Sequence, residues 1–482
     1  MKSLSKIIIL LVAGLISSCE SVLDINTDPN SPTKITPGLA LSAAQASLIT
    51  IIGGDFSNLG GFYAQYHTQS PSASQYEVID QYNLNTAFAN RSWTELYAGA
   101  LNDLEFVIKE ATANNDKGTV LIATLMKAYT FQLLVDTFGN VPYEEALTGV
   151  NNITPKTTEG SVIYLDLIDK IDSALADATS STVGSQDMIY GGEMDQWIKF
   201  ANTLKLKMYL RMSYTTLANP TKVKALLSAN NFIDNDAKFS SFGTSQNTRN
   251  PFYEVQIDRL GDVNNVASNS LLQFYELNSD PRIEAVYRPN GSGSYISIAQ
   301  GSFKSYNNTA TSYARPNIEA QTPVYLMTVS ESNFLQAEAI IRYNNGVGAK
   351  AKYDEGVKKS FATYGLSESL AIPFISTGGA YEYIADSNIE TAIRQVIIQK
   401  WASLAYINNM ESYIETTRTK FPEIVTSNNV DYSIGNRIPS VSSILTGLNV
   451  PSILYYPESE TERNPNITQH TGLTQKVWWD KK

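Results

Sequence analysis

Apolar residues recur at helical spacing along most of the chain. Trp93, Tyr97 and Leu101 follow one another at intervals of four, so they fall on one face of a helix. The clearest stripe has apolar residues at i, i+3, i+4, i+7 and i+11, namely Trp197, Phe200, Ala201, Leu204 and Met208. The pattern predicts a mainly α fold, with helices over residues 37–52, 91–113, 117–138, 158–178, around 197–208, up to 229, 330–343, 350–364 and 389–417, the last either continuous or broken into a pair.

Two sets of these predicted helices form hairpins. The helices 330–343 and 350–364 are joined by a turn that contains two glycines, and together they have the roughly 34-residue length of a tetratricopeptide repeat. Residues 91–138 make a second pair of similar type. The segments 53–87 and 231–326 lose the helical period and are rich in aromatic residues, and the chain after 418 is irregular. Paired helices that support an irregular, loop-rich face are therefore expected.

The first residues predict export and lipid attachment. Lys2 and Lys6 precede a short apolar run that ends at Ile16, which is the order of a secretory signal peptide. The run is about half the ~20 residues that a membrane-spanning helix needs. Cys19 is the only cysteine in the sequence and follows two serines at the expected cut. We therefore expect a signal peptide over 1–18, lipidation of Cys19 and a flexible, lipid-anchored leader over 19–36.

Charge excludes one class of partner. The formal net charge is −11, from 36 basic and 47 acidic residues. Without the two lysines of the signal peptide the balance is 34 minus 47, or −13. A nucleic-acid binder needs a basic face, so nucleic acid is not an expected partner, and attachment to a membrane would have to come from the lipid.

Composition favours a neutral, polar ligand. Only 17% of residues are charged, whereas 28 are tyrosine. Aromatic rings stack on the C–H faces of sugars, and amides and hydroxyls bind their rims. An ordinary extracellular surface would have the same composition.

Signatures of metal and cofactor chemistry are missing from the sequence. The two histidines, His67 and His470, are far apart, and no zinc-site, phosphate-loop or nucleophile-elbow motif occurs. No metal and no cofactor are therefore expected. Glu338 is interpreted as a buried acid bonded to a backbone group or an arginine, and Asp280 and Arg282 as an ion pair in a turn. A glycosidase-type pair of carboxylates has no motif, so a carbohydrate-active enzyme stays an alternative.

Motifs in the same order along nearly the whole chain give a resemblance to a known family. They are Asp24-Ile25-Asn26-Thr27-Asp28-Pro29-Asn30, Trp93 to Asn102, Ala128-Tyr129, Asp136-Thr137-Phe138-Gly139-Asn140-Val141-Pro142-Tyr143, Asp187 to Gly192 with Trp197 and Arg211, Asp280-Pro281-Arg282, Glu331 with Ala337-Glu338-Ala339, Gln399-Lys400-Trp401, Arg418 to Pro422, and Tyr455-Tyr456-Pro457. Together they resemble the SusD/RagB family of Bacteroidetes outer-membrane lipoproteins. The Asp136–Tyr143 block is the most specific.

The resemblance implies the fold and the function. The fold would be SusD-like, with tetratricopeptide-like helix pairs, and residues 37–482 would form a single domain. The protein would be a surface lipoprotein of the outer membrane, not an enzyme. It would bind an oligosaccharide and deliver it, as a lid, to a partner SusC-like TonB-dependent transporter. A peptide-binding member of the same scaffold is the alternative.

The ligand contacts are expected in the aromatic insert before and along the Trp93 helix and in the segment 287–313. A sugar site needs a ring platform and polar arms. The expected platform residues are Tyr66, Tyr76, Tyr82, Tyr295 and Tyr306, and the expected arms are Asp80, Arg91 and Asn102. For each of them, packing of a long loop onto the helices is the alternative.

Overall fold

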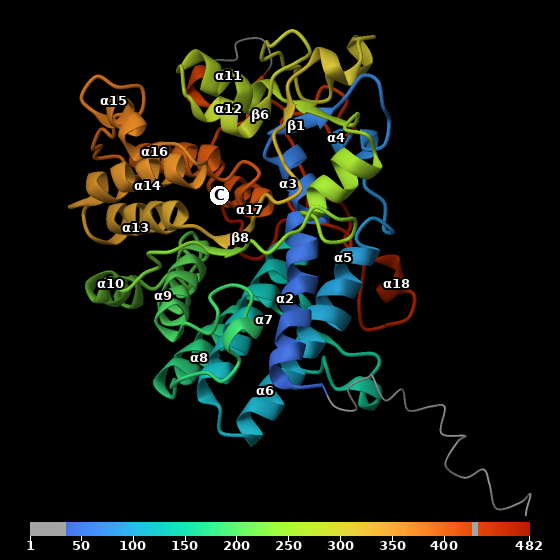
Figure 1. The fold of residues 1–482 in the computed structure, drawn as a ribbon, viewed down its shortest axis with the longest axis vertical. Coiled ribbons are helices and arrows are strands. Elements are labelled where there is room, and N and C mark those ends of the chain that lie inside the picture. The colour runs from blue at the N-terminus through green and yellow to red at the C-terminus, as the bar shows by residue number, and fades with distance from the viewer. Residues whose placement is uncertain (1–34, 427–431) are drawn as a thin grey trace, which may run out of the picture.

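The computed structural model describes residues 35–426 and 432–482. The predicted signal peptide, Cys19 and all but the last two residues of the predicted leader lie outside the described residues. Helices make up most of the ordered elements (Figure 1). They are α2 (Pro37–Gly53), α3 (Asp55–Tyr63), α4 (Glu77–Asp80), α5 (Asn90–Thr94), α6 (Asn102–Ala113), α7 (Lys117–Phe138), α8 (Gly160–Ala176), α9 (Met194–Arg211), α10 (Pro220–Ala229), α11 (Asn269–Leu277), α12 (Arg282–Val286), α13 (Val329–Tyr343), α14 (Ala349–Thr363), α15 (Ile372–Ile375), α16 (Ile389–Ser403), α17 (Asn409–Thr419) and α18 (Glu458–Thr461).

The ends of the predicted helices follow local capping chemistry. The Thr36 hydroxyl accepts from the Leu39 amide at 3.3 Å, and Pro37 occupies the first turn of α2. The Asp116 carboxylate accepts from the Thr119 amide at 3.0 Å where α7 begins. α7 ends at Phe138 and is followed by Gly139, whose φ of 77° ordinary side chains rarely adopt. The predicted bounds 117–138 agree with α7, and 37–52 agrees with α2 to one residue.

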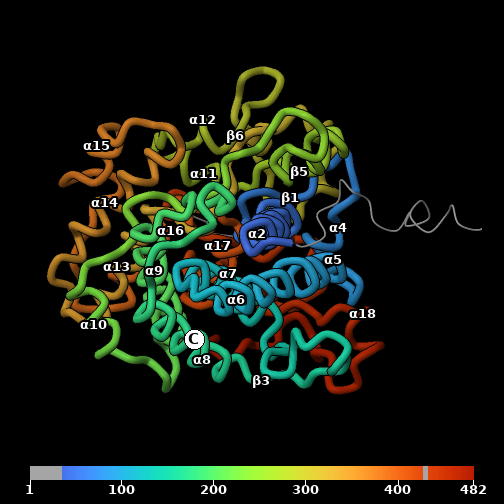
Figure 2. Tube along the Cα trace, turned by 60° about the horizontal axis from the view of Figure 1, so that its bottom comes forward, coloured from blue at the N-terminus to red at the C-terminus, as the bar shows by residue number. Residues whose placement is uncertain are grey.

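Successive helices pack as antiparallel pairs. In Figure 1, α6, α7, α8 and α9 lie in the lower part of the molecule, and α13, α14 and α16 form a second group above them on the left. Figure 2, which looks nearly along α2, shows this helix in the middle of the molecule, between α6 and α7 on one side and the segment around β5 on the other. These pairs match the tetratricopeptide-like arrangement expected from the sequence.

The segments predicted to be irregular contain more helix than expected. α3 lies within 53–87, while α11, α12 and the π-helix η4 (Tyr253–Arg259) lie within 231–326. The predicted helix over 91–113 is interrupted in its middle by the π-helix η1 (Glu95–Leu101). The predicted segment 389–417 is a broken pair, α16 and α17.

In the described part of the chain, the strands form four short antiparallel pairs. These are β1 (His67–Gln69) with β5 (Asn265–Ala267), β2 (Val141–Pro142) with β3 (Thr157–Thr158), β4 (Ala237–Phe239) with β8 (Val324–Met327), and β6 (Tyr287–Arg288) with β7 (Arg315–Pro316). Most of them join segments distant in sequence, so they fasten the long loops to the helices.

A buried ionic cluster ties together α7, α9, α13, α16 and α17. Its members are Asp136, Lys207, Arg211, Glu331, Glu338, Arg342, Lys400, Glu411, Glu415 and Arg418. Acids and bases are equal in number, which is the condition under which buried charges are tolerated. Glu338 accepts from Arg418 at 2.7 Å, which confirms its interpretation as a structural acid. Asp280 and Arg282 form the expected ion pair at 2.6 Å, and both side chains are fully shielded from solvent.

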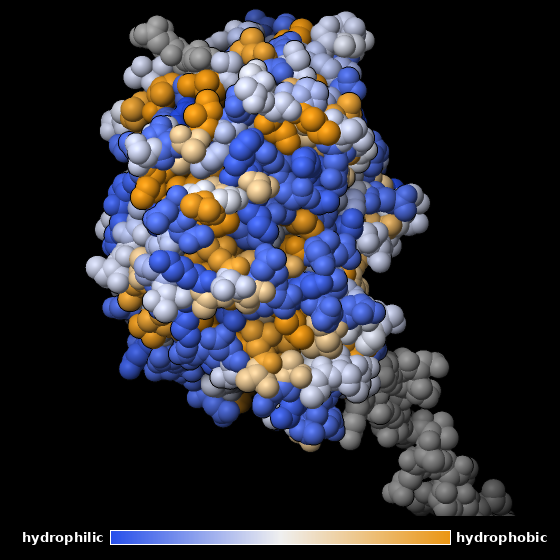
Figure 3. All heavy atoms as spheres, turned by 90° about the vertical axis from the view of Figure 1, so that its left-hand side faces the viewer, coloured by the Kyte–Doolittle hydropathy of each residue, from blue (hydrophilic) through white to orange (hydrophobic). Residues whose placement is uncertain are grey.

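Among residues 35–426 and 432–482, two helical segments have the length and apolar composition of a membrane span. They are Pro37–Tyr63 and α7. In the fold they serve as core: 56% of the apolar window of the first and 83% of that of α7 are buried. On the face of the molecule that Figure 3 shows, hydrophobic residues form separate groups among hydrophilic ones.

Candidate functional site

Three of the eight side chains expected to contact a ligand are buried. Tyr66 and Asp80 are fully buried, and Tyr82 is 1% exposed. The Tyr66 hydroxyl donates to the Trp401 carbonyl oxygen and to the Ser412 hydroxyl, both on helices more than 300 residues away. The prediction of Tyr66 and Tyr82 as exposed platform residues is therefore wrong, because α16 and α17 cover these two rings. Tyr82 borders the Arg437 pocket described below.

Asp80 has a structural environment. Its carboxylate accepts from the Thr68 hydroxyl and from the Gln69 amide, both at 2.6 Å, and from the side-chain amide of Gln300. Burial raises the pKa of Asp80 to about 6, and these three donors oppose the shift. The carboxylate thus fastens β1 to the segment around Gln300 and is not a polar arm for a ligand.

The other five expected residues are at least partly exposed. They are Tyr76, Arg91, Asn102, Tyr295 and Tyr306. The Arg91 guanidinium donates to Asp55 at 2.7 Å, and the Tyr76 hydroxyl accepts from Gln256 at 2.7 Å. Asn102 lines an open groove. Ligand contact by these five stays a prediction, and the structure favours Asn102 as the starting point.

The Asn102 groove has a volume of about 480 Å³. Its lining residues are Trp93, Thr94, Tyr97, Ala98, Asn102, Pro142, Ala146, Leu147, Gly149, Asn152, Ile153, Pro155 and Glu460. One wall is the continuous run of α5, η1 and α6, and the other is the loop over 142–155. π-helical turns often occur at functional sites, and η1 lies in this wall. The volume is within the range of pockets that hold small ligands.

Aromatic rings form the inner wall of the groove. The rings of Trp93 and Tyr97 lie 4.7 Å apart between centroids, and Trp93 also packs edge-on against Phe138. The Tyr97 hydroxyl donates to the Pro142 carbonyl oxygen at 2.7 Å. This bond joins the two walls and holds the half-buried Tyr97 ring at the groove.

Polar groups at the groove remain free for a ligand. The Asn102 side chain is exposed and has no hydrogen-bond partner among residues 35–426 and 432–482. The Glu460 carboxylate accepts from Asn464 at 3.0 Å and keeps further acceptor capacity. Ile153 is 78% exposed and adds an apolar rim. An aromatic wall beside an amide and a carboxylate suits a neutral, hydroxylated ligand.

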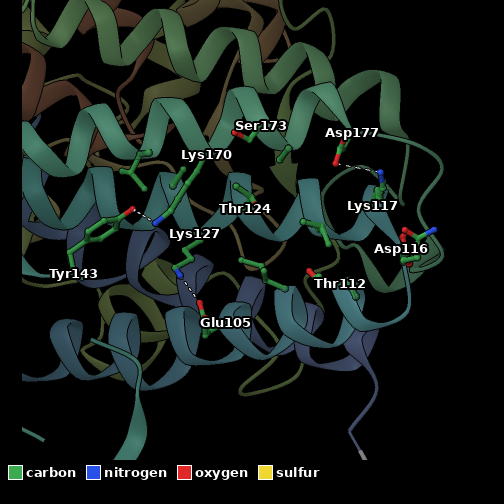
Figure 4. A pocket seen from close by; sticks show the side chains of 17 residues that line it. Glu105, Thr112, Asp116, Lys117, Thr124, Lys127, Tyr143, Lys170, Ser173 and Asp177 are labelled. Carbon is green, nitrogen blue, oxygen red and sulfur yellow. Dashed lines mark hydrogen bonds and ion pairs between the residues drawn. The ribbon is translucent and has the colours of Figure 1, made fainter. Parts of the chain in front are cut away.

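A larger cleft of about 510 Å³ lies between α6, α7 and α8 (Figure 4). Its floor is apolar, but the charged groups along it already have partners. Lys127 pairs with Glu105 at 2.5 Å, and Lys117 pairs with Asp177 at 3.4 Å. Figure 4 shows Lys170 pointing at the Tyr143 hydroxyl, to which it donates at 3.0 Å. The charged side chains of this cleft are therefore largely neutralised by neighbouring residues.

The described residues contain no group of three or more histidine, cysteine, aspartate or glutamate side chains that could hold a metal ion. His67 is buried and contacts Tyr406 and the Asn58 carbonyl oxygen, and burial lowers its pKa to about 3. His470 is stacked on Tyr456. Both histidines therefore have packing roles.

Sequence reasoning missed the outer wall of the groove. The loop over 142–155 contains Pro142, Gly149 and Pro155, which signal a loop but not its contact with η1. Glu460 reaches the groove from α18, more than 350 residues after Asn102. No periodicity in the sequence could have brought these segments together.

Residues 29–440 match the model of a SusD-like family described as "starch-binding associating with outer membrane". No match to a curated protein sequence was found.

Solved structures show the same fold at low sequence identity. A chitin-binding protein superposes with a TM-score of 0.74 at 21% identity, covering 93% of this chain and 100% of its own. A SusD/RagB family protein from Bacteroides thetaiotaomicron gives 0.73 at 22%, covering 93% and 99%. A chitin-binding SusD homologue from Flavobacterium johnsoniae gives 0.73 at 20%, covering 91% and 98%. With the family match over most of its length and this fold, the chain belongs to the SusD-like family of outer-membrane-associated proteins.

Proposed function

We propose that the protein is a lipid-anchored, surface-exposed binding protein of the outer membrane that captures an oligosaccharide in the Asn102 groove. It passes the sugar to a SusC-like TonB-dependent transporter, over which it opens and closes as a lid. The observation that carries this proposal is the match of residues 29–440 to a family described as starch-binding and associated with the outer membrane. Two structural neighbours whose titles name chitin binding support a carbohydrate ligand.

The groove supplies a physical basis for capture. A pyranose can place a C–H face against the Tyr97 ring while its hydroxyls bond the Asn102 amide and the Glu460 carboxylate. The Tyr97–Pro142 hydrogen bond fixes the ring before the ligand arrives, which lowers the entropic cost of binding.

Binding without hydrolysis fits the same groove. A glycosidase places two carboxylates on either side of the scissile bond. Among the described residues that line the groove, Glu460 is the one acid. The protein is therefore proposed to be a carrier and not an enzyme.

Titration calorimetry of the purified protein tests the ligand class. Malto-oligosaccharide, chito-oligosaccharide and a mixed peptide pool are the three ligands. Replacing Asn102 by Ala removes the free amide, and about fivefold to tenfold weaker sugar binding is expected from the loss of one hydrogen bond. The control is Lys109→Ala, an exposed position on the same helix outside the groove. Peptide binding without sugar binding would support the alternative ligand, and release of shortened sugar would contradict the carrier role.

A further inference from the structure

A second pocket is lined mainly by segments near the C-terminal end of the chain and differs in charge from the groove. It has a volume of about 380 Å³ and lies between α17, the segment 448–452 and the segment 474–476. It shares no lining residue with the Asn102 groove. Arg437 lines it, and the pocket is called the Arg437 pocket.

Arg437 is a buried cation without an acidic partner. It is 3% exposed, and its guanidinium donates through Nε to the Pro422 carbonyl oxygen at 3.1 Å and through Nη1 to that of Tyr63 at 3.2 Å. No carboxylate of residues 35–426 or 432–482 forms an ion pair with it, and Nη2 has no hydrogen-bond acceptor there. Burial lowers the pKa of Arg437 to about 10, and the side chain stays charged at neutral pH.

The other fully buried arginines show how unusual this is. Arg211 lies 3.1 Å from a carboxylate oxygen of Asp136, Arg282 lies 2.6 Å from Asp280 and Arg418 lies 2.7 Å from Glu338. An unpaired buried charge costs several kcal/mol. A fold that pairs these three arginines but leaves Arg437 without an anion has a site where an anion from solution can bind.

A hydroxyl in the same pocket also has no partner. Tyr63 is 4% exposed, lines the pocket and makes no hydrogen bond through its hydroxyl within the described part of the chain. Burial raises the pKa of Tyr63 well above its usual value, so the hydroxyl keeps its proton and can donate. A buried hydroxyl without a partner inside the protein can donate to a ligand that enters the pocket.

The remaining charged groups leave the pocket positive. Lys420 and Lys476 line it, while the Glu423 carboxylate is taken by Arg394 at 2.8 Å. Asp480 holds Lys420 at 2.7 Å. Lys476, whose side chain is 55% exposed, stands at the rim; its ammonium lies 3.9 Å from Asp480 and donates to the Lys482 carbonyl oxygen at 2.9 Å.

We propose that the Arg437 pocket binds the anionic group of an acidic sugar, with Arg437 and Tyr63 donating to the oxyanion and Lys476 at the rim. Two classes of acidic sugar carry an oxyanion on a hydroxylated ring: uronates, through a carboxylate, and sulfated sugars, through a sulfate ester. Hydroxyl and amide groups of Thr416, Asn449 and Ser452 line the same space and suit the ring hydroxyls. The choice of a sugar as the carrier of the anion rests on the proposed function, whereas the anion site itself does not.

Calorimetry at low salt with monosaccharides tests this site. The probes are glucuronate, glucose 6-sulfate and neutral glucose, each titrated into the full-length protein. At least one anionic sugar is expected to bind ten times more tightly than glucose, and the tighter one identifies the carboxylate or the sulfate as the source. Tyr63→Phe removes a hydroxyl that has no partner in the free protein, so it is expected to keep the melting temperature and to weaken anion binding about 3- to 10-fold. Arg437→Gln is expected to weaken it about 10- to 100-fold.

The control variants separate this site from the groove. Arg463→Gln, on the exposed surface, and Asn102→Ala should both leave anion binding unchanged. Two results would overturn the proposal: equal affinity for the three sugars, or full anion affinity in folded Tyr63→Phe protein. Either would show that Arg437 only hydrogen-bonds two carbonyl groups and binds no anion. Loss of anion binding in Asn102→Ala would move the ligand to the groove and overturn the proposal. Failure of neutral oligosaccharides to bind would contradict the proposed function without affecting this result.

Discussion

Replacing Arg418 by Met tests whether the buried ionic cluster stabilises the packing of the helix pairs. Arg418 is fully buried and makes six hydrogen bonds: two to Glu338, two to Glu415, one to the Leu210 carbonyl oxygen and one to the Ser213 hydroxyl. At ~1.5–3 kcal/mol for each bond to a charged group, their sum would exceed ~9 kcal/mol. Desolvation of the guanidinium offsets much of that sum, so the expected loss is about 3–5 kcal/mol, the usual cost of breaking a buried pair.

The pH dependence of this loss has a defined sign. The arginine beside them lowers the pKa of Glu338 and, more strongly, that of Glu415. A carboxyl whose pKa is lower in the folded state contributes stability above its unfolded pKa, near 4.5, and loses it as the pH falls through the folded pKa. The difference between wild type and Arg418→Met should therefore be full at pH 7 and smaller at pH 3.

Urea unfolding followed by circular dichroism measures both quantities. The control is Arg91→Met, which removes an exposed ion pair with Asp55 and should cost at most ~1 kcal/mol. The double variant Arg418→Met, Glu338→Gln should recover part of the loss, because it removes an acid that has lost a partner. A loss below ~1 kcal/mol for Arg418→Met at pH 7, or one that grows on acidification, would refute the reasoning.

Three further predictions concern the insert and the anchor. Burial raises the pKa of Asp80 to about 6, so this carboxyl binds more protons in the folded than in the unfolded state between about pH 4 and pH 6. The stability of wild type relative to Asp80→Asn should therefore fall by about 3 kcal/mol as the pH rises through that interval. A stability difference that does not change with pH in urea unfolding would contradict this. Tyr66→Ala removes a buried ring and should lower the free energy of unfolding by about 3–5 kcal/mol. Tyr306→Ala changes a side chain that is 41% exposed and should lower it by less than ~1 kcal/mol. Similar melting temperatures for the two variants would be inconsistent with the packing. Cys19→Ser should move the protein from the membrane fraction to the soluble fraction, and a variant that still sediments with membranes would argue against the lipid anchor.

Periodicity predicted the helices that pack through one apolar face. The stripe from Trp197 to Met208 lies inside α9, and the 117–138 prediction reproduces α7 because Asp116 and Gly139 mark its ends chemically. It failed for α3 and α11, which are short and are buried by contacts distant in sequence. The sequence of α3, with paired glycines, has no amphipathic stripe to detect.

The candidate site was harder to predict because burial depends on distant segments. Tyr66 and Asn102 both carry hydrogen-bonding groups and both lie in the region where ligand contacts were expected. In the structure, α16 and α17 cover Tyr66, whereas Asn102 stays at the surface. Arg437 had no motif at all. Its unpaired charge is visible only once Pro422 and Tyr63 are seen to supply its two hydrogen-bond acceptors.

A crystal structure of the protein with a bound oligosaccharide tests the central claim most directly. The sugar is expected in the Asn102 groove, with one ring against Tyr97 and a hydroxyl within hydrogen-bond distance of the Asn102 amide. A sugar bound at the α6–α8 cleft, or at the loops around Tyr295 and Tyr306 with the groove empty, would contradict the assignment of the groove as the site of capture.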